Sequence, residues 1–314
     1  MEIRRLRPAD TNDLVALLTE SFAEEISLSG IGAGSVRGQV RSAIAANRPP
    51  DSLLLRAGGS VLEIWVAVEG DKILGSYGLH GTSPLHISTV AVRPERRGRG
   101  IGRALMEHAL ERARGLGAKQ VVLEVLAHNE AAVKLYRSLG MQEYDRRRTY
   151  ARRLPREHRA PPVHPRIELS PVRRAHYARW EEVLRASVPA EAWSFSELYR
   201  SEYLSNTVTR WFEERVGPAR TTRRVVLLDG CVAGFLRVRS APGQPLADIA
   251  APLYLPELGP YMADLIQAAE GLLNRSDRPL CRLYVSEDRP EGWMAATELG
   301  YEFERSWLYM YRNI

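Results

Sequence analysis

The sequence is poor in cysteine, with only Cys231 and Cys281 among 314 residues. Both lie in apolar, strand-like runs. Neither has a second cysteine or a histidine at the short spacing that zinc sites use, which argues against a disulfide framework and a structural metal site. We therefore expect two reduced, buried thiols and no bound metal.

Long hydrophobic runs are also lacking. No stretch approaches the roughly eighteen consecutive apolar residues that span a bilayer, and the segment after Met1–Arg5 has no signal-peptide core. We therefore expect no membrane association and a cytoplasmic protein. The composition, 45% hydrophobic and 26% charged, is typical of soluble globular chains, and the length favours two domains over one.

Lysine is scarce, since Lys72, Lys119 and Lys134 are the only ones, and arginine supplies most of the positive charge. Arginine is concentrated between Arg146 and Arg166, a stretch with eight arginines and one acidic residue. Because this stretch also contains prolines, we interpret it as a solvated connection. A nucleic-acid partner is the least favoured alternative.

The chain shows a weak internal repeat. Leu123–Val125 and Leu139–Met141 are matched by Leu283–Val285 and Leu299–Tyr301, in both cases 160 residues later. A polar, proline-rich segment separates the two halves. The pattern predicts two copies of one fold, with a first domain at 1–153, a basic linker at 154–166 and a second domain at 167–314.

In the first copy, hydrophobic periodicity and turn residues predict alternating strands and helices, and therefore an α/β fold. The expected strands are 2–7, 61–69, 72–80, 85–92 and 120–126. The expected helices are 10–27, one that begins near Gly100, and one that is capped by Asn129 and ends before Gly140.

The most informative motif is a glycine-rich turn between a strand and a helix. It reads R-x-x-G-x-G, at Arg97, Gly100 and Gly102. Such a turn presents backbone N–H groups at a helix N-terminus, where a phosphate binds favourably, and glycines let the ligand approach closely. It lacks the lysine and hydroxyl residue of a P-loop, and its spacing differs from the dinucleotide-binding G-x-G-x-x-G.

This motif, the strand before it and the block from Leu123 to Met141 resemble the GNAT N-acetyltransferase superfamily, and within it enzymes that acetylate protein N-termini, notably of a ribosomal protein. The resemblance implies two tandem GNAT-like domains, each a mixed, largely antiparallel sheet flanked by helices. It implies acetyl-CoA as the cosubstrate and an amine acceptor. The implied donor-binding residues are Val90, Ala91, Val92, Arg97, Gly98, Arg99, Gly100, Ile101, Gly102, Arg103 and Asn129.

By the same resemblance, Tyr136 protonates the leaving thiolate and Glu124 is the base that deprotonates the amine. On spacing alone, Tyr136 also fits the apolar face of its helix. A carboxylate at Glu124, in an apolar strand, also fits a structural group oriented by backbone or arginine. These alternatives stay open at the level of the sequence.

Other polar residues carry weaker indications. Glu24 and Glu25 could attract a cationic amine, although a solvated helix face is favoured. The four histidines of the first half are expected to be structural or solvent-facing, because none has an obvious partner in the sequence. They are His80, His86, His108 and His128.

The second copy departs from the motif. At the offset of 160, Pro260 and Met262 replace the two glycines, Ala296 replaces the tyrosine, and Arg289 replaces Asn129. We expect that this half neither binds acetyl-CoA nor catalyses. The acceptor stays open among a small amine, an antibiotic and a protein N-terminus, and so does the choice between a monomer and a homo-oligomer. A non-catalytic acyl-CoA sensor or assembly module is the rival interpretation.

Overall fold

The computed structural model describes residues 1–23, 37–38, 61–81, 84–155, 159–204, 220–240, 246–273 and 280–314. Its contacts define two compact units. Unit 1 comprises residues 1–125, 129–143 and 310–314, and unit 2 comprises residues 126–128 and 144–309. Each unit thus contains a segment from the other half of the sequence. The domain limits predicted at 153 and 167 stay a prediction.

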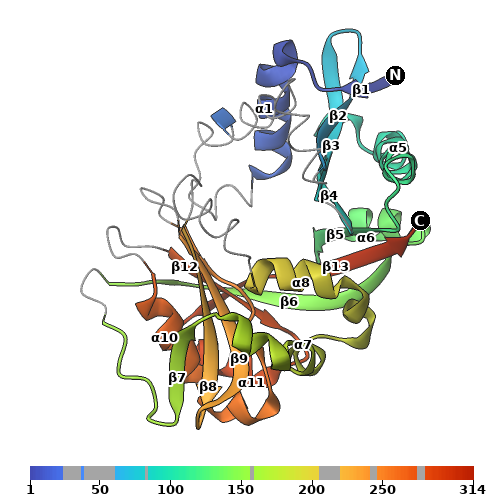
Figure 1. Ribbon diagram of the computed structural model, residues 1–314. Helices are drawn as coiled ribbons and strands as arrows, with labels where there is room; N and C mark the ends of the chain where they lie inside the picture. Colours follow the sequence, from blue (N-terminus) through green and yellow to red (C-terminus); the bar gives the residue numbers. More distant parts are fainter. Residues whose placement is uncertain are drawn as a thin grey trace. The chain divides into compact units, whose positions relative to one another are not determined.

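Unit 1 is built on a sheet with the strand order β1-β2-β3-β4-β5, next to which the end of β13 lies. The strands are β1 (Glu2–Arg5), β2 (Val61–Glu69), β3 (Lys72–Gly81), β4 (Leu85–Val92) and β5 (Gln120–Leu126), and the helices are α1 (Thr11–Ser21), α5 (Ile101–Gly115) and α6 (Glu130–Ser138). Helices α1 and α5 lie on opposite sides of the sheet (Figure 1).

The predicted elements of the first half are confirmed within a few residues, except that α1 ends at Ser21. Glu24 and Glu25 lie outside the described residues. Helix α1 is positioned by Leu14, Leu17 and Leu18, which share one helix face and are buried against the sheet.

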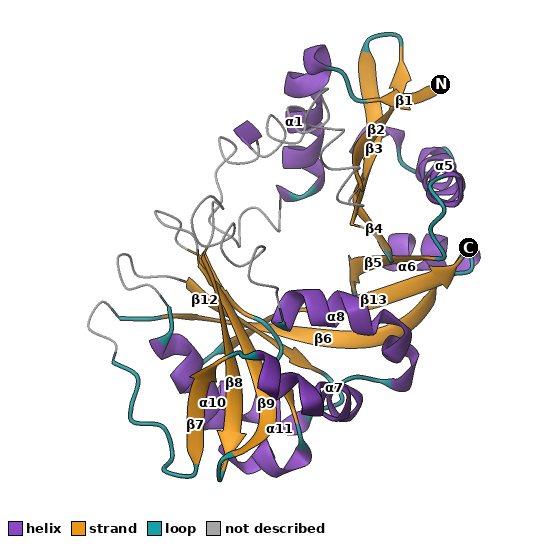
Figure 2. Cartoon of the chain, in the orientation of Figure 1, coloured by secondary structure: helices purple, strands orange, loops and turns teal. Residues whose placement is uncertain are grey.

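Unit 2 has the strand order β13-β6-β12-β10-β9-β8-β7, and β11 pairs with β9. Its strands are β6 (Gln142–Arg153), β7 (Ile167–Pro171), β8 (Arg220–Leu228), β9 (Cys231–Ser240), β10 (Leu246–Ile249), β11 (Leu253–Tyr254), β12 (Leu280–Ser286) and β13 (Glu302–Asn313), and its helices are α7 (Trp180–Ser187), α8 (Ser196–Tyr203), α10 (Met262–Gly271) and α11 (Pro290–Glu298). Figure 2 shows β7, β8 and β9 side by side within this sheet.

The two units repeat the same local details. The hairpin β2–β3 has a register shift between Ala67 and Val68, and β8–β9 has one between Val226 and Leu227. A Cβ on Gly75 would lie 2.6 Å from a backbone oxygen of β4, and one on Gly234 would lie 2.8 Å from a backbone oxygen of β11. The predicted fold class, two copies of one α/β fold with a mixed sheet flanked by helices, is confirmed.

The arginines from 146 to 153 are not part of a solvated connection, as the sequence suggested. They lie in β6, which pairs with β12, and several have partners inside unit 2. Arg147 donates to Asp145 over 2.7 Å, Arg148 to Glu287 over 2.8 Å, and Arg152 to the Leu299 carbonyl over 2.5 Å. These arginines therefore form hydrogen bonds and ion pairs within unit 2.

The expectation of two buried thiols is half right. Both cysteines are free, but Cys231 is exposed, because it directly follows the turn at Asp229 and Gly230. Cys281 is buried, and burial raises the pKa of its thiol to about 12.

A buried carboxylate ties three elements of unit 1 together. Glu63 of β2 is 3% exposed and accepts two bonds from Arg112 of α5, at 2.8 and 2.9 Å, and one from Arg5 of β1 at 2.5 Å. The Trp65 indole N–H adds a bond of 2.9 Å. Burial alone would raise the pKa of Glu63, but Arg112, Trp65 and Arg5 together lower it to about 2.

We expect Glu63→Gln to lower the free energy of unfolding by about 3 kcal/mol at pH 7, since it removes a buried negative charge that two partly exposed arginines pair with. A lowered pKa stabilises the fold above the ordinary carboxyl pKa, and this stabilisation disappears as the pH falls toward 2. Urea unfolding at pH 7 and at pH 3 measures the effect.

The matched control is Glu69→Gln, because Glu69 is exposed and paired with Arg96 at 3.1 Å. It should change the stability by less than about 0.5 kcal/mol. An equal loss for Glu63→Gln at both pH values would contradict the electrostatic explanation.

Candidate functional site

The site is created where two parallel strands of unit 1 part. β4 pairs with β5 only at Leu85↔Val121 and His86↔Val122. From Ile87 onward this edge of β4 has no β5 backbone opposite it. Its N–H and C=O groups can therefore pair with an extended ligand as they would with an added strand.

A bulge in β4 accompanies the parting. Ser76 pairs with Ala91 and Gly78 pairs with Ser88, so Thr89 and Val90 together face the single residue Tyr77. Thr89 has a φ of 48°, which is unusual for a β-branched residue. Bulges re-aim backbone groups, and this one lies at the predicted donor residues Val90, Ala91 and Val92.

The glycine-rich turn follows directly. Gly98 and Gly100 have φ values of 75° and 81°, and a Cβ on either would meet open space. Gly100 is the N-cap of α5, and no side chain caps the helix or places a carboxylate in its first turn. The N–H groups of Ile101, Gly102 and Arg103 therefore form an uncapped, electropositive helix start, as a pyrophosphate site requires.

Arginines fix and surround this turn. Arg93, which is buried, donates to the Ile73 carbonyl over 2.6 Å and pairs with Asp13 of α1. Arg97 and Arg103 are exposed; Arg97 donates to the Val92 carbonyl over 3.2 Å, and Arg103 donates to Ser138 over 2.8 Å. Arg99 is exposed as well. The turn is thus held at its base by the buried Arg93 and is surrounded by exposed arginine side chains.

Helix α6 begins beside the site. Asn129 caps it by accepting the Ala132 N–H at 3.2 Å, so this residue has a structural role, and its exposed amide is also the one predicted to contact the donor. A Cβ on Gly102 would lie 3.4 Å from the Leu135 side chain, which shows how closely the starts of α5 and α6 pack.

Tyr136 lies on the buried side of α6 and is 6% exposed. Burial raises the pKa of its phenol to about 12, so the hydroxyl carries its proton at neutral pH. Both readings of the sequence are therefore compatible with its position: the ring belongs to the apolar face of the helix, and the hydroxyl is a proton donor.

Glu124 is exposed, in contrast to its neighbours in β5. The argument that a buried carboxylate must be functional therefore does not apply to it. Its surroundings are more informative, because it acts electrostatically on His80 of β3.

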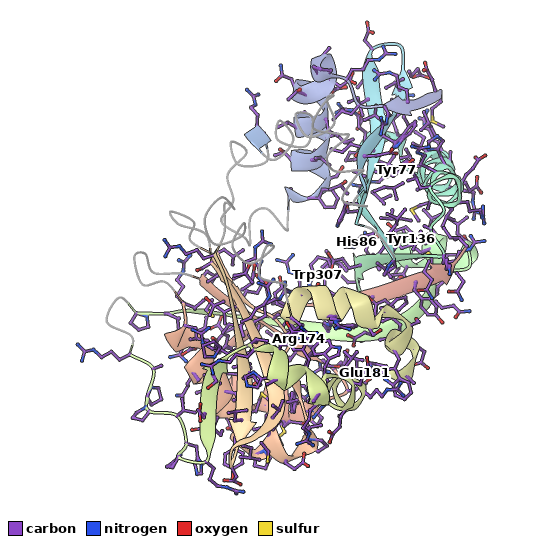
Figure 3. All side chains as sticks on the ribbon, viewed as in Figure 1. Tyr77, His86, Tyr136, Arg174, Glu181 and Trp307 are labelled. Atoms are coloured by element: carbon purple, nitrogen blue, oxygen red, sulfur yellow. The ribbon has the colours of Figure 1, made fainter. Side chains whose placement is uncertain are left out.

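Sequence reasoning missed the contacts of the histidines. His80 and His86 are opposite each other in the β3–β4 register, with ring centroids 4.5 Å apart. His108 bonds to the Tyr77 hydroxyl at 2.6 Å on the α5 side. Figure 3 marks Tyr77, His86 and Tyr136. The sequence did contain a signal for this pair. His80 and His86 lie the same number of residues from the middle of the β3–β4 connection, as cross-strand partners in a hairpin do.

In unit 2 the corresponding strand edge, at β11, is already bonded to the unit's own side chains, beside a cavity lined by residues that include Ser187, Tyr254 and Arg289. The Tyr254 N–H of β11 donates to Ser187 over 2.6 Å, and Arg289 donates to the Tyr254 carbonyl over 3.3 Å. The Arg289 guanidinium also lies 3.7 Å from the centre of the Tyr254 ring. Tyr203 donates to the Ala251 carbonyl over 2.5 Å. A strand-like ligand would have to displace these bonds.

Among the described residues, no group of three or more histidine, cysteine, aspartate or glutamate side chains is arranged to hold a metal ion. No helix among the same residues has the length and apolar character needed to cross a membrane.

Known proteins resemble the first half by sequence. Residues 43–141 match the acetyltransferase (GNAT) family. The chain is 41% identical over 91 residues to N-alpha-acetyltransferase RimI of Mycobacterium tuberculosis. This match covers 27% of this chain and 56% of the relative. It is 44% identical over 61 residues to the ribosomal protein bS18 alanine N-acetyltransferase of Escherichia coli, covering 19% and 41%. The chain thus spans about half the length of these relatives.

Solved structures resemble the whole chain. A tandem GNAT protein from the clavulanic acid biosynthesis pathway has a TM-score of 0.63 at 19% identity, covering 99% of this chain and 98% of the other. A GCN5-related N-acetyltransferase from Sphaerobacter thermophilus has a TM-score of 0.65 at 15% identity, covering 99% and 95%. Residues 43–141 are therefore similar in sequence to the acetyltransferase (GNAT) family, and the chain has the fold of a tandem GNAT protein.

Proposed function

We propose that unit 1 is an acetyl-CoA-dependent N-acetyltransferase that acts on a primary amine. The observation that carries this proposal is the parted β4 edge leading directly into the uncapped start of α5. The edge pairs with the pantetheine arm, and the N–H groups after Gly100 receive the pyrophosphate. The family match over residues 43–141 supports acetyl-CoA as the donor.

The chemistry is a direct attack of a neutral amine on the thioester. A backbone N–H near Val92 stabilises the oxyanion, and Tyr136 donates its proton to the leaving thiolate, while Glu124 helps to remove the ammonium proton. The names of the relatives point to a peptide that begins with alanine as the first acceptor to test.

The direct test is release of CoA from acetyl-CoA with three acceptors: an alanine-initiated hexapeptide, 2-phenylethylamine and an aminoglycoside. We expect turnover with at least one of them, with mass spectrometry showing the acetylated amine. Tight acetyl-CoA binding without turnover on any of the three would favour the rival interpretation, a non-catalytic acyl-CoA sensor.

Gly100→Trp should raise the KM for acetyl-CoA by at least about tenfold, because the indole occupies the approach to the N–H groups and even one lost phosphate contact has that effect. Gly117→Trp is the matched control. Gly117 follows the other end of α5, has a φ of 78°, and also faces open space. Equal KM values for the two variants would contradict the assignment of the turn.

Tyr136→Phe should lower kcat by about 100-fold and leave the KM for acetyl-CoA unchanged, since it removes a proton donor but keeps the buried ring. Steady-state kinetics with the best of the three acceptors measures this. Tyr77→Phe, which removes a buried hydroxyl on the α5 side, is the control. An unchanged kcat in Tyr136→Phe would leave the phenol with a packing role only.

Acetyl-CoA should bind with a stoichiometry of one per chain, because in unit 2 the Tyr254 backbone is already bonded and a 3-10 helix with Pro260 stands in place of the glycine turn. Isothermal titration calorimetry gives this number directly. The Gly100→Trp variant should weaken this single binding event, and a second binding event whose affinity the substitution leaves unchanged would mean that unit 2 also accepts the donor.

A further inference from the structure

Two histidines form a close pair on one face of the unit 1 sheet. His80 of β3 and His86 of β4 are cross-strand partners, with ring centroids 4.5 Å apart and planes tilted by 54°. Ser88, two residues after His86, has its hydroxyl 3.3 Å from Nδ1 of His80. The pair therefore lies directly beside the point at which β4 and β5 part.

The pair faces away from α5. Tyr77 bonds to His108 of α5, and side chains alternate along β3, so His80 lies on the opposite, α1 side. Ala91 and Ile73 pack against α1 on that side. His80 and His86 are both partly exposed, so we expect the amine to reach the pair on this side.

Glu124 lies on the same face as the histidines. His86 pairs with Val122 in the parallel register, and Glu124 is two residues further along β5. The titratable groups that act on His80 are therefore His86 from β4 and Glu124 from β5. On α1, Asp13 and Glu20 are instead paired with Arg93.

Two imidazoles at this distance do not both carry a positive charge readily, so the pair binds one proton. Burial, and then His86, lowers the pKa of His80 to about 4, whereas Glu124 acts in the opposite direction. His80 is thus neutral at neutral pH and can hold its partner in place. Of the two imidazoles, His86 is the one on the strand that pairs with β5, the strand that carries Glu124.

We propose that His86 accepts the proton of the acceptor ammonium group and that His80 is its positioning residue. The inference rests on the proposed N-acetyltransferase activity and extends it. It also changes the role of Glu124, whose carboxylate stabilises the protonated imidazole beside it and attracts the cationic acceptor.

The step balances as follows. The ammonium N–H bond breaks and its proton moves to His86, which later releases it to solvent. The neutral amine forms the new N–C bond, the C–S bond breaks, and the thiolate takes the proton of Tyr136. The second proton lost from the attacking nitrogen restores the phenol. The products are the amide, CoA and one released proton.

The test is the pH profile of kcat/KM with the alanine-initiated hexapeptide, 2-phenylethylamine and the aminoglycoside. At pH 7, His86→Gln should lower kcat/KM for the acceptor by about 100-fold, the usual range for a lost proton-transfer group. At pH 9 the loss should shrink to a few-fold for the peptide, because its amine, with a pKa near 8, is then about nine-tenths neutral without help.

The companion variants separate positioning from folding. His80→Asn keeps a polar group near Ser88 and should retain activity that His80→Ala loses. His108→Gln, on the α5 side, should leave the pH profile unchanged. All variants should bind acetyl-CoA with wild-type affinity in calorimetry, which shows that the donor site is folded.

The outcomes are distinct. An active wild type with an equally active His86→Gln variant at pH 7, or a loss that persists at pH 9, overturns the histidine assignment and leaves the proposed function intact. A wild type that is inactive on all three acceptors overturns the proposed function, and the histidine assignment with it.

Discussion

The function of unit 1 depends on the parting of β4 from β5 after two paired residues. A fully paired parallel strand would use the β4 backbone groups that a donor needs. The parting leaves them available, and the bulge at Thr89 and Val90 sets their direction. The same strand then leads into Gly98 and Gly100, so one continuous stretch of chain supplies both the edge that we propose for pantetheine and the turn that we propose for the pyrophosphate.

Unit 2 has the same scaffold as unit 1 but lacks the features that we propose for donor binding. It repeats the bulged hairpin and the close approach at Gly234, yet the edge of β11 is bonded to Ser187 and Arg289. A 3-10 helix that contains Pro260 precedes α10, where unit 1 has its glycine turn. Unit 2 thus keeps the interactions that stabilise the fold and lacks the glycine turn and the unbonded strand edge that we propose for donor binding in unit 1.

Much of the fold could be predicted from the sequence, because strands β2 to β5 and helices α5 and α6 have clear periodicity and turn residues at their ends. The glycine turn was recognisable from its spacing. Contacts between residues on different strands were harder to predict. The pairing of His80 with His86 depends on hairpin register, and the ion pairs of Arg147 and Arg148 depend on β6 lying beside β12. The local sequence preferences of a strand do not determine which residues of another strand it pairs with.

The end of β13 has a consequence for how the protein is made. Strand β5 is bordered by β13, and Gln120 bonds to Asn313 across 193 positions of sequence. The Ile314 N–H bonds to the Lys119 carbonyl at 3.0 Å. A ribosome that has synthesised the whole first half has therefore produced a sheet with one edge still uncovered. That edge is closed only when the second half has been translated, so the nascent chain carries an open β-edge for most of its synthesis.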